Sequence, residues 1–170
     1  MSVLVTLGIL VLLLIAAGTL YDRLRTLHRN VQRTWQHLER HRHARQEIMG
    51  RLIDACASRG ADPSQVSAAA TARRNAEQAS GPPDAARKEQ VLGDAVGQLL
   101  TASAIAIDAS VGTLARDLAE AEQTYRAARE AYNDTARRYN SLITTPPASW
   151  LAGFADFRRA ELFTPLIPDP

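Results

Sequence analysis

The amino-acid sequence predicts an all-α protein in which an N-terminal transmembrane helix continues into an elongated antiparallel four-helix bundle. Three observations support this fold class. The chain begins with a long apolar stretch, apolar residues then recur every three or four positions, and glycine and proline are few and gathered at a few points. We expect three parts: a transmembrane anchor over residues 1–21, a helical bundle over 22–145 and an aromatic-rich C-terminal tail over 146–170.

The anchor is predicted from residues 3–20, which carry no charged side chain. A helix needs about 20 apolar residues to cross the hydrocarbon core of a bilayer. A cleaved signal peptide is the alternative, because Ala16-Ala17-Gly18 resembles a cleavage site, but the first residues lack the usual positive charge. Between residues 23 and 45 there are seven arginines and one acid, Glu39, and basic flanks stay in the cytoplasm. The sequence therefore predicts an N-terminus outside and a body in the cytoplasm.

Composition narrows the class of partner. The formal net charge is only +2 over 170 residues, so charge gives no reason to expect nucleic acid as a partner.

All basic residues except Lys88 are arginine, and alanine is abundant, which is typical of a GC-rich bacterial genome. Cys56 is the single cysteine, so no intrachain disulfide can form. Together with the predicted anchor, this composition leads us to expect a membrane protein of a bacterial cell.

The first body helix is expected to continue straight out of the membrane. Its apolar stripe runs through residues 24–38, lapses over the polar residues 40–46, and resumes at 48–56. Gly60 then reads as a helix stop, and Asp62-Pro63 as the cap and first position of a second helix over about 63–79, with alanines on its inner side.

Residues 80–84 break the second helix, and a third apolar stripe follows. In this third helix Gly93 and Gly97 stand four residues apart, which favours close packing against a neighbour.

The fourth helix carries the longest regular pattern in the chain. Its apolar or aromatic positions step by three and four from residue 111 to 142, as in a coiled coil or a long bundle. Tyr125, Tyr132 and Tyr139 lie on this stripe, and Asn133 and Asn140 flank it. We interpret the repeated Tyr-Asn pair as packing chemistry, with the asparagines hydrogen-bonding to a neighbouring helix.

The tail over 146–170 is rich in aromatic side chains. Because an antiparallel fourth helix returns toward the membrane, the tail is expected at the membrane-proximal end. It either caps the bundle near Trp35 or lies on the bilayer surface, where aromatic and arginine side chains suit the headgroups. The lipid-facing candidates are Arg23, Arg25, Arg29, Arg33, Trp150, Phe154, Phe157, Arg158 and Arg159.

The four histidines all fall in the first body helix. His37 and His41 are spaced four apart and could chelate a metal, but no third ligand shares their face cleanly. There are two competing interpretations: a solvated face that gains charge near pH 6 and then binds anionic lipid more tightly, or surface histidines without a special role. The sequence has no phosphate-binding loop, zinc-type cysteine pair or nucleophile elbow, so we expect no catalytic, cofactor-binding or metal-binding residues.

These residues together resemble the LemA family of bacterial membrane-anchored helical proteins. The resemblance rests on the two Tyr-Asn units with the proline and Gly-Phe-containing tail after them, and on the segment from Arg29 to Trp35. Gly50-Arg51 and Arg42 depart from the family pattern, so the chain resembles a divergent member. The resemblance implies a single-pass inner-membrane protein with an elongated helical body, and it supplies no enzymatic activity.

The expected function is a non-enzymatic membrane-anchored adaptor or scaffold that docks another membrane or envelope protein, with homo-oligomerisation as a further possibility. The alternative is a lipid-facing structural protein that binds anionic headgroups through the juxtamembrane arginines and histidines and the aromatic tail.

Overall fold

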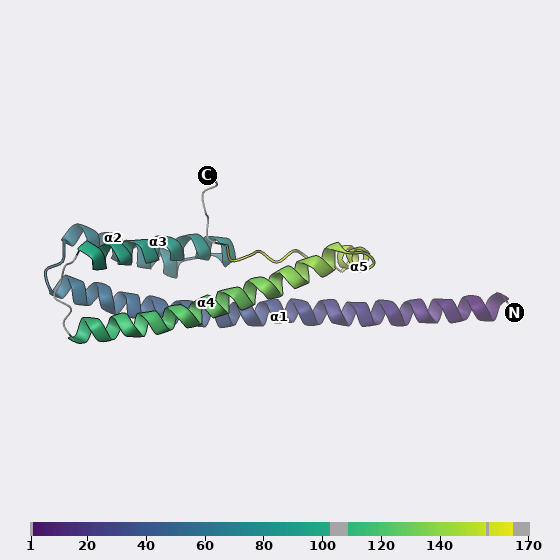
Figure 1. Ribbon diagram of the computed structural model, residues 1–170. Coiled ribbons are helices and arrows are strands. Elements are labelled where there is room, and N and C mark those ends of the chain that lie inside the picture. The colour runs from purple at the N-terminus through teal and green to yellow at the C-terminus, as the bar shows by residue number, and fades with distance from the viewer. Residues whose placement is uncertain (1, 103–108, 156, 165–170) are drawn as a thin grey trace.

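The computed structural model describes residues 2–102, 109–155 and 157–164. Within these ranges the chain forms five α-helices and no strand. In Figure 1 they are labelled in chain order. Their bounds are α1 Ser2–Ser58, α2 Pro63–Glu77, α3 Gly81–Ala102, α4 Ala109–Thr144 and α5 Ala148–Phe154. The all-α prediction is confirmed, as is the prediction that anchor and first body helix are continuous.

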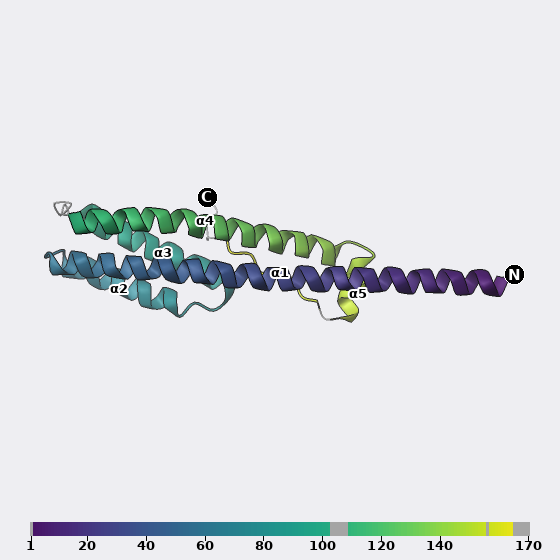
Figure 2. The same ribbon diagram turned by 90° about the horizontal axis from the view of Figure 1, so that it is seen from below.

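The molecule is a rod whose spine is α1. Residues 4–19 of this helix are exposed to solvent, and Leu20 is the first residue that packs against the rest of the chain. From Leu20 to Ser58 the helix therefore carries the body for about 58 Å, at 1.5 Å per residue. Figure 2 shows the anchor segment projecting from one end, in line with the body.

The body has two layers. Helices α1 and α4 lie side by side and antiparallel along the rod, and form the first layer (Figures 1 and 2). The short α2/α3 hairpin covers α1 only in the half far from the anchor. In the half near the anchor, α5 and the extended residues 157–164, here called the C-terminal strap, take the place of the hairpin. The four-helix bundle is thus complete only in the distal half.

The turns between the helices form as their residue types dictate. Gly60 has φ +79°, a backbone conformation that favours glycine, and ends the turn after α1. The Asp62 carboxylate then accepts a hydrogen bond from the Ser64 N–H at 2.8 Å and caps α2, with Pro63 at its first position. Gly81, with φ +74°, opens α3, and the Asp84 carboxylate accepts from the Ser80 N–H at 3.0 Å.

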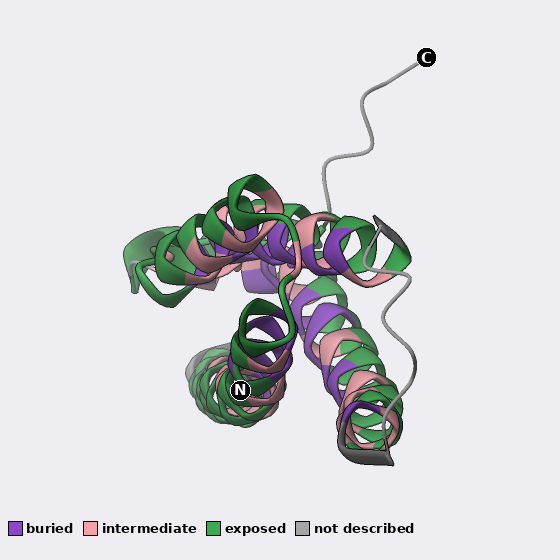
Figure 3. Cartoon of the chain, turned by 90° about the vertical axis from the view of Figure 1, so that its left-hand side faces the viewer, coloured by how far each residue is buried: buried purple, intermediate pink, exposed green. Residues whose placement is uncertain are grey.

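Two hydrophobic clusters follow from this arrangement. The proximal cluster is aromatic: Trp35 and Phe157 pack on a buried set that includes Tyr132, Tyr139 and Phe163. The distal cluster is aliphatic and contains Cys56, where burial raises the pKa of the thiol. In Figure 3 the buried ribbon lies on the faces that the helices turn toward one another.

In the strap-bearing half of α4, Tyr132 and Tyr139 are buried at their predicted positions, and two other positions of the predicted stripe are displaced by one residue. Ala136 and Ile143 are buried, whereas the predicted Thr135 and Leu142 are only half-buried. The shift arises because α4 packs there against two partners, α1 on one side and the strap on the other. On α3, Leu92, Val96 and Leu99 of the apolar stripe are buried, whereas Val91 of the same stripe is exposed.

Candidate functional site

The repeated Tyr-Asn pair holds the C-terminal strap. The Asn133 amide donates to the Phe163 carbonyl and its oxygen accepts from the Phe163 N–H, both at 2.8 Å. Asn140 makes the same two bonds to Ala160, again at 2.8 Å each. The prediction that these asparagines bond to a neighbouring helix is therefore wrong, because an extended backbone segment and not a helix faces them.

The spacing explains why two such clamps fit one strap. Seven residues of α-helix advance about 10.5 Å. Three residues of extended chain advance about 10 Å. The seven-residue step from Asn133 to Asn140 on α4 thus matches the three-residue step from Phe163 back to Ala160. Each asparagine side chain bonds to both the N–H and the C=O of one strap residue, as the backbone of a neighbouring β-strand would.

The two tyrosines of the repeat bind the same strap. The Tyr132 hydroxyl donates to the Glu161 carbonyl at 2.6 Å, and the Tyr139 hydroxyl donates to the Arg158 carbonyl at 2.9 Å. Burial raises the pKa of both phenols, that of Tyr132 to about 12. The tyrosines are seam residues, as predicted, and their hydroxyls point at the strap.

Trp35 and Tyr125 enclose the end of the strap. The Trp35 ring lies 5.3 Å from Tyr132 and 6.3 Å from Phe163, centroid to centroid, and Tyr125 lies 6.2 Å from Phe163. Phe163 is 1% exposed. The prediction that the tail caps the bundle near Trp35 is confirmed for this part of the tail.

A second part of the tail remains open to its surroundings. Helix α5 buries Ala148 and Ala152 against the body and leaves Trp150 68% and Phe154 93% exposed. Figure 1 places α5 beside the stretch of α1 where the body begins, and Leu20 packs on the same cluster as Leu151.

The other lipid-facing candidates are distributed around this end of the rod. Phe157 is half-buried, with its ring 5.9 Å from Tyr21 and 6.1 Å from His28. Part of the Phe157 ring is therefore covered by the body. The arginine candidates are all exposed: Arg23, Arg25, Arg29, Arg33, Arg158 and Arg159.

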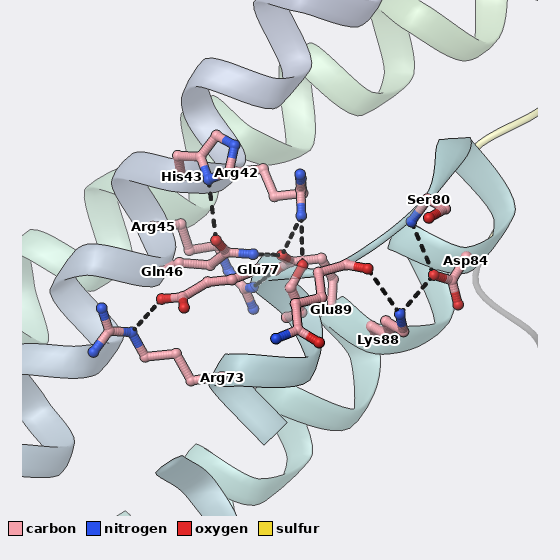
Figure 4. A network of polar contacts seen from close by, with 12 residues as sticks. Arg42, His43, Arg45, Gln46, Arg73, Glu77, Ser80, Asp84, Lys88 and Glu89 are labelled. Atoms are coloured by element: carbon pink, nitrogen blue, oxygen red, sulfur yellow. Dashed lines mark hydrogen bonds and ion pairs between the residues drawn. The ribbon is translucent and has the colours of Figure 1, made fainter. Parts of the chain in front are cut away.

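Sequence reasoning missed a buried ionic network between the two halves (Figure 4). Glu89 of α3 is 3% exposed and accepts from Arg45 Nη1 at 2.7 Å, while Gln46 donates to its other oxygen. Arg42 Nη1 lies 3.6 Å from the same carboxylate and donates to the Ala76 carbonyl at 2.8 Å. Arg45 Nε also pairs with Glu122 of α4. One arginine thus ties α1 to both α3 and α4.

The electrostatics of this network are those of charges removed from water. Burial raises the pKa of Glu89, although Arg45, Gln46 and Arg42 each act in the opposite direction. The Arg45 guanidinium also lies 4.9 Å from the centroid of the Tyr125 ring. The carboxylate is therefore held by a set of partners that must stay together.

A signal for this network was present in the sequence. The buried positions 38, 42, 45, 49, 52 and 56 of α1 continue the alternation of three and four through the polar segment. On α3, positions 85, 89, 92, 96 and 99 do the same. On both helices the spacing of three and four continues through residues that are not hydrophobic. Charged residues at these positions are therefore expected to be buried and to face one another.

The histidine pair is brought together as its spacing predicts. The Nε2 atoms of His37 and His41 lie 3.3 Å apart. Desolvation, together with His37 and Arg40, lowers the pKa of His41, so this residue gains its charge at a lower pH than the surface interpretation assumed. Among the described residues, no group of three histidine, cysteine or acidic side chains is arranged to hold a metal ion.

Comparison with known protein families decides the membership. A family model described as the LemA family matches residues 34–166. The chain belongs to the LemA family. The matched segment contains the network, both Tyr-Asn clamps and the strap. No curated protein matches the chain. LemA proteins are membrane-associated, and α1 contains the one stretch, among the described residues, that is long and apolar enough to span a bilayer.

Proposed function

We propose that this LemA-family chain is a non-enzymatic, membrane-anchored adaptor that holds a docking surface at a fixed distance from the bilayer. The observation that carries the proposal is the continuity of α1 from the anchor into the body. A single helix transmits the position and orientation of the membrane to the far end of the rod. The ionic network ties α3 and α4 to this helix, and the clamps hold the strap on α4.

The orientation that fits this role places the body in the cytoplasm. The arginines that follow the anchor support it, because such residues resist translocation. The test uses the exposed Ser67 of α2, changed to cysteine in a Cys56→Ser background, and a membrane-impermeant maleimide. We expect labelling only after lysis. Labelling of intact cells places the body outside the membrane and removes the proposed orientation.

The adaptor role is tested by breaking the continuity of α1. Four glycines inserted between Thr19 and Leu20 uncouple the body from the anchor, and four alanines at the same point lengthen the helix by about 6 Å without breaking it. Proximity labelling from an enzyme fused after the C-terminus is expected to recover a defined set of membrane or envelope proteins with the native chain. We expect the glycine insertion to disperse that set and the alanine insertion to retain most of it. Recovery of no specific partner, together with a monodisperse monomer, contradicts the adaptor.

A second candidate function is supported by the exposed aromatic pair on α5. Trp150 and Phe154 are one helical turn apart, and α5 packs where α1 leaves its exposed apolar segment. Tryptophan and phenylalanine favour the boundary between headgroups and acyl chains. In this role the chain is a lipid-facing structural protein, with the exposed arginines near the anchor attracting anionic headgroups.

The full-length chain in vesicles containing brominated acyl chains separates the two tryptophans. Trp35 packs in the body, about 22 Å along α1 from Leu20. We expect bromine to quench a large part of the tryptophan fluorescence in the native chain and almost none in Trp150→Phe. Absence of quenching in the native chain removes the lipid-facing role of α5 and leaves the adaptor proposal intact.

A further inference from the structure

An open groove runs between α1 and α4 at the anchor end of the rod. Its volume is about 840 Å³. The lining residues are Asp22, Arg23, Thr26 and Leu27 from α1, and Arg138, Ser141, Leu142 and Thr145 from α4. The groove is separate from the strap site, because Arg138 and Asn140 lie about 200° apart around α4.

The position of the groove relative to the anchor suggests its occupant. The exposed apolar segment ends at Thr19, and Leu20 begins the packed body. The groove occupies α1 from Asp22 to Leu27, a rise of about 7.5 Å. The headgroup layer on each side of the hydrocarbon core is about 5 to 8 Å thick. With α1 spanning the bilayer, the groove lies at the depth of the lipid headgroups.

The side chains of the groove suit a phospholipid. Leu27 and Leu142 are half-buried and give it an apolar floor, while Arg23 and Arg138 are exposed and cationic. Asp134, one helical turn before Arg138, pairs with Arg137 at 3.0 Å and not with Arg138. Guanidinium groups bind phosphate oxygens in a bidentate manner.

We propose that this groove binds one phospholipid of the adjoining leaflet. Its phosphate lies between Arg23 and Arg138, and the glycerol lies on Leu142, from which the acyl chains run toward the anchor. An anionic headgroup is favoured, because two arginines outweigh the single carboxylate of Asp22. The inference rests on the lipid-facing function proposed above and gives it a specific site.

Native mass spectrometry of the full-length chain in detergent, titrated with phosphatidylglycerol or phosphatidylcholine, tests the site. The groove variant Arg23→Ala/Arg138→Ala is compared with Arg51→Ala/Arg126→Ala, which removes the same charge from exposed positions of α1 and α4 outside both the groove and the lipid-facing set. We expect one tightly retained phosphatidylglycerol per native chain. The groove variant is expected to bind it at least about tenfold more weakly, and the control variant less than about twofold more weakly.

A third variant separates shape from charge. Leu142→Trp fills the floor of the groove and keeps both arginines, so it is expected to reduce retention of phosphatidylglycerol while circular dichroism shows an unchanged helical content. Equal weakening by the two arginine pairs overturns the specific site and leaves diffuse headgroup attraction standing. Displacement of the lipid by millimolar inorganic phosphate shows a soluble-anion site and also overturns the proposal. Unchanged retention in all variants does the same.

Discussion

The two halves of the body solve one packing problem in different ways. Both must cover the same face of the α1/α4 pair. The distal half does so with the α2/α3 hairpin. Helix α2 contributes Ala69, Ala72 and Ala76 to the distal cluster, and α3 contributes leucine and valine side chains. The proximal half does so with an extended strap that is fixed by four side chains of α4 and packed among aromatic rings.

The difference shows what each kind of cover requires. A helix satisfies most of its own backbone hydrogen bonds, so away from the ionic network the hairpin is held to α1 mainly by apolar contact. An extended segment has unsatisfied N–H and C=O groups, and these must find partners where they are buried. The Tyr-Asn repeat supplies such partners. The proximal half therefore depends on a few specific side chains, and the distal half on distributed small contacts, with the ionic network at the junction.

The largest effect is expected at that junction. Glu89→Gln keeps the shape of the side chain but leaves Arg42 and Arg45 buried without their shared carboxylate. Breaking a buried ion pair in this way costs about 3–5 kcal/mol. Urea unfolding of the full-length chain in detergent is expected to show a loss of this size, whereas Asp134→Asn, which removes an exposed pair, is expected to change little.

A companion triple variant sharpens the interpretation of this loss. Replacing Arg42, Arg45 and Glu89 together by methionine is expected to restore much of the stability, because an apolar core of similar volume avoids the desolvation cost. If Glu89→Gln is as stable as the native chain, the network does not hold the two halves together.

The second effect concerns the strap alone. Asn133→Ala removes both bonds to the Phe163 backbone and leaves a buried N–H and C=O without partners. We expect a loss of about 2–3 kcal/mol. Hydrogen exchange is the sharper measurement: the amides of residues 157–164 should exchange faster in the variant, and those of α2 and α3 at the native rate. Faster exchange throughout both halves contradicts the division into two separately held regions.

Much of this architecture could be predicted from the sequence, and the failures have a common cause. Helix periodicity, Gly60 and the Asp62-Pro63 start require only local geometry, so the continuous α1 and the turn after it were predicted. The partner of Asn133 was not predicted, because it is an extended segment. The sequence of this segment has no regular apolar spacing that would indicate packing against α4. The burial of Arg42 and Glu89 could not be predicted from hydrophobicity, because both are charged residues at positions where the helical period requires burial.

The third prediction tests how much room the distal half contains. A Cβ added to Gly97 meets nothing within 4 Å, whereas one added to Gly93 lies 3.3 Å from Arg45 Nη2. Gly97→Ala is therefore expected to raise the free energy of unfolding by about 1 kcal/mol through helix propensity. Gly93→Ala is expected to gain less or to lose, because it displaces an arginine of the network. Equal gains at both positions contradict a tightly packed junction, and thermal unfolding of the pair measures this.

The smallest change in stability is expected when the Tyr132 hydroxyl is removed and its ring is kept. Tyr132→Phe removes the bond to the Glu161 carbonyl but keeps the ring contact with Trp35, so at neutral pH we expect a loss of about 0.5 kcal/mol. The pH dependence is more informative. Burial raises the pKa of Tyr132 to about 12, while an unfolded tyrosine ionises near 10, so the folded state favours the neutral phenol. Its contribution is fully present below about pH 10 and is lost as the pH rises toward about 12.

Urea midpoints at pH 8, 10 and 11.5 are therefore expected to fall more steeply for the native chain than for Tyr132→Phe. Tyr125 and Tyr139 have raised pKa values in both proteins, so the difference between the two slopes isolates Tyr132. Parallel slopes mean that the Tyr132 hydroxyl ionises in the folded state as it does in the unfolded chain. The strap is then held by Asn133, Asn140, Tyr139 and ring packing, and ionisation of the Tyr132 hydroxyl does not weaken it.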